Sequence, residues 1–405
     1  MANMIQQSST NPDMHGGTTI SQSPVLRATA SPGFQLIHGQ HVVSALKSIP
    51  DESVHMVATS PPYFGLRDYG TPPVVWDGRC DCLHKWNSAG QCENDGCDAW
   101  LGHLGLEPTR KMYVGHMVQI FREVRRVLRS DGTLWLNLGD KWRKGILQGI
   151  PGRVAVALED DGWVRKDDII WHKTVHKPES VRNRTTRCHE NIIMMTKKQS
   201  GHYFDCDGIL EPYKDGTHSL NPDIATGTLV GRRRRSVWSI PTVPTNGLHI
   251  APWPEALVDL MVTAGSSPIA CAHCGAPFRR ELIRFSVPTI AAPQPSRHDG
   301  GLTSLPGHDR TGMSHGAADT LRRENPTRML GWEPNCSCGT EEIATCAVLD
   351  PFSGSATTGV VAVRRGRSYV GIDISNEYLA DASARIESAA QRRRVELSEI
   401  TGKSC

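Results

Sequence analysis

The segment 346-CAVLDPFSGSATTGVVAVRRGRSYVGIDIS-375 is the part of the sequence that decides the fold. An apolar run ends at Asp350, a short turn contains Gly354, a helix-forming stretch follows, and a second apolar run ends at Asp373. The order strand, glycine turn, helix, strand is typical of a parallel sheet with helices on its faces. Ligands of such sheets bind beyond the carboxyl ends of the strands, so both aspartates are expected beside a ligand.

The turn at Gly354 has the properties of a cofactor cradle. Glycine lets the backbone approach a ligand closely, and the helix that opens at Thr357 offers free N–H groups. Asp373 follows where a carboxylate accepts hydrogen bonds from ribose hydroxyls. The turn has neither the lysine of a phosphate-binding P-loop nor the GxGxxG of a dinucleotide site. The pattern therefore indicates a cradle for a nucleotide or S-adenosylmethionine, and argues against phosphate transfer.

A second stretch, 56-MVATSPPYFG-65, places two prolines directly after an apolar run. Proline removes a donor from the hydrogen-bond ladder, so a central strand cannot continue through this pair. The strand over 53–59 must therefore end here, which brings Ser60 and Tyr63 to the carboxyl edge of the sheet. A Pro-Pro pair alone is most often only a turn. The rest of the chain is needed to give it a function.

Apolar runs and helical periodicities alternate along the chain. Strands are expected at 34–39, 53–59, 133–139, 167–172 and 191–196, and helices at 41–47, 111–132, 153–159, 252–265 and 376–394. This alternation predicts an α/β fold with a mainly parallel sheet covered on both faces. Residues 1–33 are expected to form a disordered tail. Two stretches rich in Cys, Gly and Pro, 71–110 and 271–344, are expected to be insertions into a catalytic domain formed by 34–270 and 345–395.

The two motifs together resemble the exocyclic-amino DNA methyltransferases, which methylate cytosine N4 or adenine N6. The matching residues are 56-MVATSPPY-63, then 349-LDPFSGSATTG-359 and 369-YVGIDIS-375. The catalytic motif precedes the cofactor motif, which is the permuted order of the β group of that family. The resemblance covers residues 34–395 apart from the two insertions, and both motifs in this order are highly specific. The variant 59-TSPPYFGLRDYG-70, the Cys-rich insert and 169-IIWHK-173 look like phage or prophage members.

The resemblance implies a permuted, seven-stranded Rossmann-like methyltransferase sheet, S-adenosylmethionine as cofactor and double-stranded DNA as substrate. The target base is flipped out of the duplex. Ser60 Oγ and the backbone carbonyl of Pro61 then accept the two amino hydrogens, and Tyr63 stacks on the ring. This turns the nitrogen lone pair toward the sulfonium methyl without a covalent intermediate. Serine at the first position favours cytosine N4, with adenine N6 a close second.

The resemblance also assigns residues to the site. Those implied for catalysis are Ser60, Pro61, Pro62 and Tyr63, and those implied for cofactor binding are Thr59, Asp350, Phe352, Ser353, Gly354, Ser355, Ala356, Thr357, Thr358 and Asp373. The sequence departs from the family twice. Gly39-Gln40 stands where the family has Gly-Asp, and Ala356 replaces a glycine. We expect a negative φ at Ala356, where a methyl group is tolerated. The stretch 249–257 either flanks the methionine end of the cofactor or is only an amphipathic core helix.

Twelve cysteines without a secretion signal indicate a reducing compartment and argue against disulfides. The alternative to metal binding is a set of incidental thiols. Two close pairs are typical of a zinc ribbon, namely Cys271, Cys274, Cys336 and Cys338. An earlier group offers five ligands for four places: Cys80, Cys82, His84, Cys92 and Cys97. We take Cys82, His84, Cys92 and Cys97 as its candidate set. Both zinc sites are expected to be structural.

The net charge is only +3, but the basic residues are clustered. Region 172–248 is expected to contact DNA and recognise the target, through phosphates bound by Arg182, Arg184, Arg187, Arg232, Arg233, Arg234 and Arg235. A solvated charged face is the alternative for any one of them. We expect 232–235 on the DNA side, beside the catalytic edge, and the acidic stretch 205–231 as a loop near the target-recognition surface. We expect no membrane span and a cytoplasmic protein of a bacterial or phage-infected cell. A homodimer and a cognate restriction endonuclease stay open as partners. Rival functions are an RNA or protein-amide methyltransferase and a catalytically inert, zinc-bearing DNA-binding protein.

Overall fold

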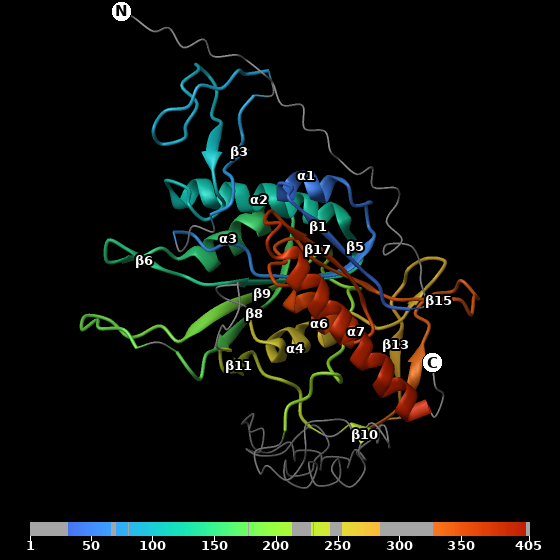
Figure 1. Cartoon of the computed structure of the whole chain (residues 1–405). Helices are drawn as coiled ribbons and strands as arrows, with labels where there is room; N and C mark the ends of the chain where they lie inside the picture. Colours follow the sequence, from blue (N-terminus) through green and yellow to red (C-terminus); the bar gives the residue numbers. More distant parts are fainter. Residues whose placement is uncertain are drawn as a thin grey trace, which may run out of the picture.

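The computed structural model describes residues 31–65, 70–79, 81–176, 178–212, 228–229, 231–243, 253–283 and 327–401. At its centre lies one eight-stranded sheet with the spatial order β1-β17-β16-β2-β5-β9-β8-β11 (Figure 1). The strands are β1 (Phe34–His38), β2 (Val54–Thr59), β5 (Leu128–Leu138), β8 (Val164–His172), β9 (His189–Thr196), β11 (Val237–Ser239), β16 (Ala347–Asp350) and β17 (Ser368–Asp373).

The sheet is wider by one strand than the seven expected. Short β11 adds to the outer edge, where it pairs in parallel with β8 and buries Trp238. The pairings from β1 through β5 are also parallel, which confirms the expected mainly parallel sheet. In contrast, β9 runs antiparallel to both β5 and β8. The amino end of β9 therefore lies at the edge where its neighbours have their carboxyl ends.

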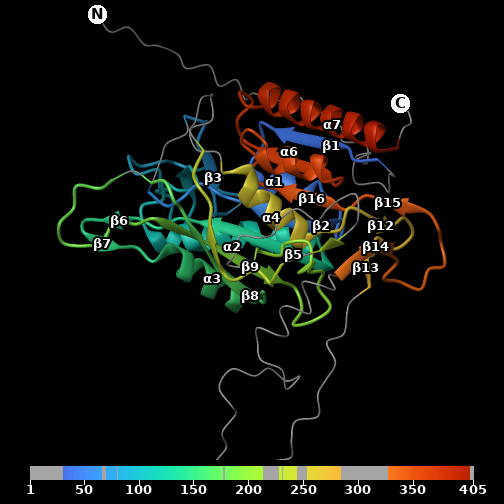
Figure 2. The ribbon, with the colours of Figure 1, turned by 90° about the horizontal axis from the view of Figure 1, so that it is seen from below.

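Helices cover both faces of the sheet (Figure 2). One face carries α1 (Val42–Lys47), α2 (Arg110–Val127) and α3 (Ile150–Asp160), and the other carries α4 (Glu255–Gly265), α6 (Thr357–Arg364) and α7 (Leu379–Thr401). Each group of helices buries its apolar stripe in a separate core, and all six residues of β2 are buried between the two. The N-cap Thr109 of α2 accepts a hydrogen bond from the Met112 N–H, which stabilises the helix by about 1 kcal/mol.

The expected boundary between helix 111–132 and strand 133–139 is wrong. The helix ends at Val127, and β5 begins at Leu128 with extended backbone (ψ 138°). Leu128 already pairs with Val54 of β2, and a bulge precedes the next pair, Met56 with Thr133. Pairing with the neighbouring strand overrides the helical periodicity of these residues.

The first insertion stands out from the sheet above α2 (Figure 1). Its strands β3 (Val74–Trp76) and β4 (Trp100–Gly102) pair antiparallel. Buried His116 of α2 joins it to the domain, because its ring contacts Glu107 Oε1 at 2.9 Å and Asp77 Oδ2 at 3.1 Å. Trp76 stacks on the same ring with centroids 4.5 Å apart. The insertion is therefore fixed to α2, the helix that packs in the same core as β2 and β5.

The second insertion lies at the opposite edge, beside the amino ends of β2 and β16. Its elements are β12 (Ala270–Cys271), β13 (Arg279–Ile283), β14 (Thr327–Glu333) and β15 (Ile343–Ala344), and β14 also pairs with β10 (Thr228–Leu229). Buried His55 of β2 holds it, since Nε2 contacts the Gly275 carbonyl at 2.9 Å and Nδ1 accepts the Ala347 N–H. Burial lowers the pKa of His55 to about 4, so the ring is neutral and its Nε2–H donates to Gly275. No helix within the described ranges is long and apolar enough to cross a membrane.

Candidate active site and metal centres

A cavity of about 950 Å³ opens at the carboxyl edge of the sheet. Ser353, Gly354 and Asp373 line one end, and Ser60 and Tyr63 line the other. The two motifs that the sequence places almost 300 residues apart, with Thr59 and Asp350 separated by 291, therefore meet in one cavity. The volume is at the upper end of the range for ligand sites and gives room for a cofactor and a base side by side.

The cofactor end is built on a tight turn. Gly354 has a φ of +49°, and its N–H donates to Asp373 Oδ2 at 2.7 Å. Ala356 also has a positive φ, +57°, so the expectation of a negative φ there is wrong. The left-handed conformation is imposed because Ala356 is the N-cap of α6 and its N–H closes the turn onto the Ser353 carbonyl. An alanine in this region costs roughly 1 kcal/mol, which burial of its methyl group in the core offsets.

One buried carboxylate joins the two motifs. Asp350 accepts hydrogen bonds from Thr59 Oγ1 and Thr358 Oγ1, both at 2.7 Å, and from the Phe352 N–H at 3.0 Å. Burial raises the pKa of Asp350 to about 6, although these three donors oppose the shift. Asp350 thereby fixes the end of the catalytic strand against the cofactor turn.

The structure separates the implied cofactor residues into two sets. Those that line the cavity are Asp350, Phe352, Ser353, Gly354, Ser355, Thr357 and Asp373. Thr59, Ala356 and Thr358 are buried behind them and do not line it, so their direct contact with a cofactor stays a prediction that the geometry does not favour. Further residues, outside the implied cofactor set, complete this end: Gln40, Trp253, Ser375 and Tyr378. Positions 249–252 lie outside the described residues, but Trp253 directly after them lines the cavity.

At the base end, a hydrogen-bond network surrounds Ser60. Its Oγ lies 3.1 Å from the Tyr63 hydroxyl, which donates to Glu190 Oε2 at 2.7 Å. The Asn137 amide donates to both Tyr63 and Glu190 at 2.8 Å, and Lys173 forms an ion pair with Glu190. Burial, together with the charge of Glu190, raises the pKa of Tyr63 well above its usual value, so the phenol stays protonated. Ser60 is therefore held beside a protonated phenol and the neutral Asn137 amide.

Asn137, Lys173 and Glu190 were not found from the sequence. The signal for Asn137 was available, because it lies near the end of the predicted strand 133–139 and so at the same edge as Ser60. Glu190 directly precedes the predicted strand 191–196, and the periodicity of that strand does not reveal its direction in the sheet. Only the antiparallel course of β9 brings it to the cavity.

The three arginines between β8 and β9 differ in their surroundings. They belong to an arm, residues 173–188, that we call the β8–β9 arm. Arg182 is exposed, whereas the Arg184 guanidinium lies 3.5 Å over the Trp142 ring and pairs with Glu179. Arg187 lines the cavity with its side chain 16% exposed, and its buried Nε has no hydrogen-bond partner within the described part of the chain. Arg184 also lines the cavity, and Arg187 lies 3.9 Å from Asp140 Oδ2, so both have a carboxylate partner within the chain.

The run Arg232–Arg235 lies elsewhere. It precedes the amino end of β11, which is parallel to β8, so it sits at the edge opposite the cavity. Arg232 and Arg235 pair with Glu211, and Arg234 donates to the carbonyls of Ile209 and Leu210. The expectation that this run lies beside the catalytic edge is corrected, because these arginines hold a neighbouring segment of the chain. The expected DNA contact of Arg232, Arg233, Arg234 and Arg235 stays a prediction without geometric support.

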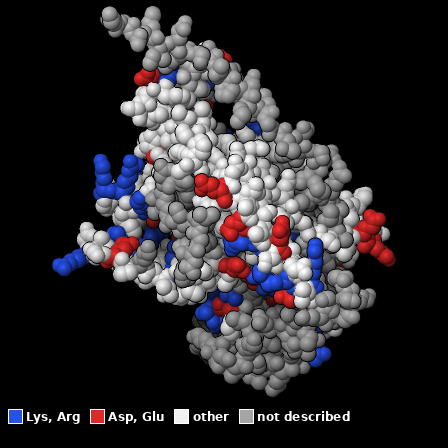
Figure 3. All heavy atoms as spheres, in the orientation of Figure 1, with Lys and Arg blue, Asp and Glu red and all other residues white. Residues whose placement is uncertain are grey.

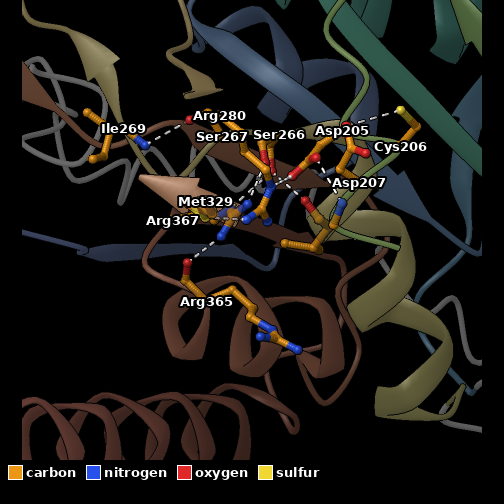
Figure 4. Close-up of polar contacts among 12 residues, drawn as sticks. Asp205, Cys206, Asp207, Ser266, Ser267, Ile269, Arg280, Met329, Arg365 and Arg367 are labelled. Atoms are coloured by element: carbon orange, nitrogen blue, oxygen red, sulfur yellow. Dashed lines mark hydrogen bonds and ion pairs between the residues drawn. The ribbon is translucent and has the colours of Figure 1, made fainter. Parts of the chain in front are cut away.

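Figure 4 shows the polar cluster around Asp205–Asp207, a segment that precedes Arg232–Arg235 in the chain. Arg280 of β13 donates to Asp205 Oδ2 at 2.6 Å, and the buried guanidinium of Arg367 donates to the Ser266 carbonyl at 2.5 Å. Burial lowers the pKa of Arg367 to about 10. The residues from 205, expected in a loop near the target-recognition surface, are thus fixed beside the second insertion. Residues 213–227 of that expected loop lie outside the described residues.

Both candidate metal sets converge in space. Cys82, His84, Cys92 and Cys97 form one group and Cys271, Cys274, Cys336 and Cys338 the other, each with its ligand atoms within 4.8 Å of one another. Tetrahedral zinc with bonds near 2.3 Å requires sulfur atoms about 3.8 Å apart. The Sγ atoms of Cys82 and Cys92 are 3.8 Å apart, and Cys97 Sγ lies 3.5 Å from His84 Nδ1. The fifth candidate, Cys80, lies outside the described residues.

Comparison with known proteins connects this geometry to a family. The DNA methylase family model matches residues 54–270 and 344–384. The Type II methyltransferase M.SmaI of Serratia marcescens is 29% identical over 371 residues, which cover 84% of this chain and 87% of that protein. M.Cfr9I of Citrobacter freundii is 28% identical over 384 residues, 88% of each protein. The solved PvuII DNA methyltransferase (cytosine-N4-specific) aligns over 91% of this chain and 95% of its own, with 15% identity and a TM-score of 0.48.

The family match spans more than half of the chain and includes both motifs that line the cavity. The chain therefore belongs to the N6/N4 DNA methylase family and is a DNA methyltransferase that moves a methyl group from S-adenosylmethionine to an exocyclic amino nitrogen of a base.

Proposed function

We propose that the target is the N4 amino group of cytosine, with adenine N6 the second candidate. The observation that supports this is a serine, rather than an acidic or amide residue, at the head of the cavity. Ser60 Oγ and the Pro61 carbonyl accept the two amino hydrogens of a flipped base. Asn137 and Tyr63 orient the serine hydroxyl through the network described above. The nitrogen then directs its lone pair toward the cofactor end of the cavity.

The chemistry needs little beyond positioning. When bound, S-adenosylmethionine supplies a methyl group on a cationic sulfur that is already a good leaving group. The side chains hold the amine in line and exclude water, and the amine loses a proton at or after transfer. The Tyr63 ring packs closely on Gly139, where an added Cβ would lie 2.6 Å from the ring. This contact fixes the orientation of the ring that stacks on the base.

The base is tested by expression in a host without DNA methylation, followed by modification-sensitive sequencing of its genome. N4-methylcytosine at a fixed motif supports the proposal, and N6-methyladenine replaces it with the second candidate. The same data give the recognition sequence. An unmodified genome, with DNA methylated by the purified protein in vitro, would mean that the host lacks the motif.

Asp373→Ala should weaken cofactor binding by roughly 10- to 100-fold, the loss expected for charge-assisted hydrogen bonds to ribose hydroxyls. Asp373 lines the cavity and also accepts a hydrogen bond from the Gly354 N–H. The substitution therefore removes the ribose contact and also destabilises the turn at Gly354. Calorimetric titration with S-adenosylmethionine measures the change. Asp381→Ala, at an exposed position of α7, is the matched control. Unchanged affinity of the Asp373 variant would place the ribose elsewhere.

We propose further that each Cys cluster holds one structural zinc ion. The donor sets fit, because each offers four thiolate or imidazole ligands whose ligand atoms lie within 4.8 Å of one another. Backbone N–H groups also stabilise the thiolates. Hydrogen bonds from residues 274 and 273 help to lower the pKa of Cys271 to about 7, and those from residues 79 and 99 help to lower that of Cys97 to about 6. Elemental analysis of purified protein should find two zinc ions per chain.

DNA contact through the β8–β9 arm predicts a salt effect. Replacing Arg182, Arg184 and Arg187 with alanine should weaken binding of cognate and scrambled duplexes alike. Each lost phosphate contact should also flatten the slope of log K against log salt by about one unit. Arg184 and Arg187 each pair with a carboxylate of the chain, so the single variant of exposed Arg182 should change the slope most.

Anisotropy titrations at several salt concentrations give these slopes. Arg122→Ala, on α2 and paired with Asp161, is the control and should leave the slope unchanged. A relaxed methylation motif with an unaltered slope would instead assign the arm arginines to base edges.

A further inference from the structure

A small hairpin lies in the chain between β5 and α3, and its exposed residues have no role in the site described so far. It consists of β6 (Trp142–Arg143) and β7 (Ile146–Leu147), with Trp142 opposite Leu147 and Arg143 opposite Ile146. Lys144 and Gly145 form the turn with φ values of +51° and +74°. Two positive values are the mark of a type I′ turn, the turn that matches the twist of a tight hairpin. Figures 1 and 2 both show the hairpin projecting from the body of the molecule.

The hairpin is held firmly at its base. Two-stranded hairpins are marginally stable alone, so this support matters. The buried carboxylate of Asp140 accepts the N–H groups of Lys141, Gly149 and Ile150. Gln148 adds a hydrogen bond from its N–H to the Lys141 carbonyl and another from its side chain to the Ile146 carbonyl. The hairpin is therefore a rigid projection rather than a loose loop.

Its outer surface is apolar, which is unusual for a projection. Ile146 is 63% exposed and Leu147 is 43% exposed, and the exposed Lys144 lies beside them in the turn. Arg143 is also exposed, but its guanidinium donates to the Pro108 carbonyl at 3.1 Å. Large aliphatic side chains on a fixed, exposed tip bordered by cations suit a partner that offers both an apolar interior and negative charge. Stacked bases between two phosphate backbones have both properties.

The position of the hairpin points to the same partner. Lys141 and Trp142 line the cavity that contains Ser60, so the hairpin stands at the entry of the base site. Arg184 of the β8–β9 arm lies over Trp142 from the other side, and the two projections are neighbours. In Figure 3, Lys and Arg side chains protrude at the margin where Figure 1 draws both projections.

We propose that the β6–β7 hairpin inserts Ile146 and Leu147 into the duplex at the target step, where they fill the space that the flipped base leaves. Lys144 at the turn contacts a neighbouring phosphate. The aliphatic contacts compensate for lost base stacking and raise the population of the flipped state. This inference rests on the flipped-base mechanism proposed above.

The test compares Ile146→Ala/Leu147→Ala with the native enzyme on two duplexes, once the motif is known. One duplex is fully paired, and the other carries a mismatch opposite the target base, which lowers the cost of flipping. On the paired duplex, the single-turnover rate should fall roughly 10- to 100-fold, as expected for the loss of two buried aliphatic side chains. On the mismatched duplex, the rate should stay close to native. Fluorescence of 2-aminopurine beside the target should lose its flipping signal on the paired duplex only.

Equal losses on both duplexes, or native rates on both, would overturn the proposal. Native binding of S-adenosylmethionine and a native melting temperature verify that the variant is folded. Ile146→Val/Leu147→Met keeps apolar volume and should retain the rate on paired DNA. Light scattering addresses a second copy of the chain as the partner: a dimer that the alanine variant dissociates, with flipping unchanged, would assign the tip to an interface. If the native enzyme itself fails to flip the base yet methylates it, the flipped-base mechanism fails instead.

Discussion

Ser60→Ala should cut methyl transfer by about 100-fold or more while S-adenosylmethionine still binds with native affinity. The serine hydroxyl lies at the base end of the cavity, and within the described residues its hydrogen bonds go to Tyr63 and Asn137 rather than to the cofactor turn. Its contact with the amine is strongest as the nitrogen becomes tetrahedral, so its loss affects the rate and not cofactor binding. Single-turnover transfer of a tritiated methyl group and calorimetry measure the two quantities separately.

Ser53→Ala provides the matched control for this variant. Ser53 precedes the other end of the same strand and donates to the Pro50 carbonyl at the surface. Its replacement should leave transfer unchanged. A Ser60 variant that turns over at the native rate would remove the proposed acceptor, and one that loses cofactor affinity in parallel would point to collapse of the cavity.

Replacing one ligand of either proposed zinc site should lower the free energy of unfolding more than any single substitution at the surface. Structural zinc contributes on the order of 10 kcal/mol to small metal-bound units, comparable to the net stability of a whole domain. We expect Cys97→Ser and Cys274→Ser each to reduce the zinc content from two ions to one and to lower the melting temperature. Elemental analysis and calorimetry provide both values. Cys206→Ser, outside both clusters, should keep two ions.

The two zinc variants should differ in activity. The first insertion supplies Thr71, Val74 and Trp76 to the cavity wall, so Cys97→Ser should also impair transfer. The second cluster docks through His55 at the amino ends of the strands, where it borders no part of the cavity. Cys274→Ser protein that remains folded should therefore transfer methyl groups at near the native rate. Two zinc ions retained in both variants would rule out both sites.

Local patterns were enough to predict the longer strands and helices of the central domain, the sheet edge where the two motifs meet, and the residues of both Cys clusters. The Pro-Pro break after β2 and the turn at Gly354 are each determined by neighbouring residues. The DNA substrate was correctly inferred, although Pro-Pro-Tyr alone left RNA and protein amides open. The direction of each strand could not be predicted from the sequence, because apolar residues alternate in the same way in parallel and antiparallel strands. For that reason Glu190 and the edge of Arg232–Arg235 were missed.

Backbone conformation at Ala356 was unpredictable for a related reason. Its φ depends on how the turn closes onto Ser353 and on the helix that follows, and both are fixed by the completed sheet. Similarly, the partner of Arg184 is Trp142, a residue of a hairpin that has no strong period-two pattern. Side-chain partners across long separations are set by packing, which single-sequence periodicity does not encode.

The tie between Thr59 and Asp350 has a consequence for when the enzyme becomes active during its synthesis. Thr59 leaves the ribosome 291 residues before Asp350 does. The pairing of β2 with β16 is delayed by a similar length of chain. At about 5–20 residues per second, this delay lasts roughly 15 to 60 seconds. During it, a nascent chain already contains Ser60–Tyr63, the residues proposed for catalysis, but lacks the turn proposed to bind the cofactor and β16, one neighbour of β2. Growing chains are thus unable to modify the genome, and prematurely terminated ones that lack β16 are inert.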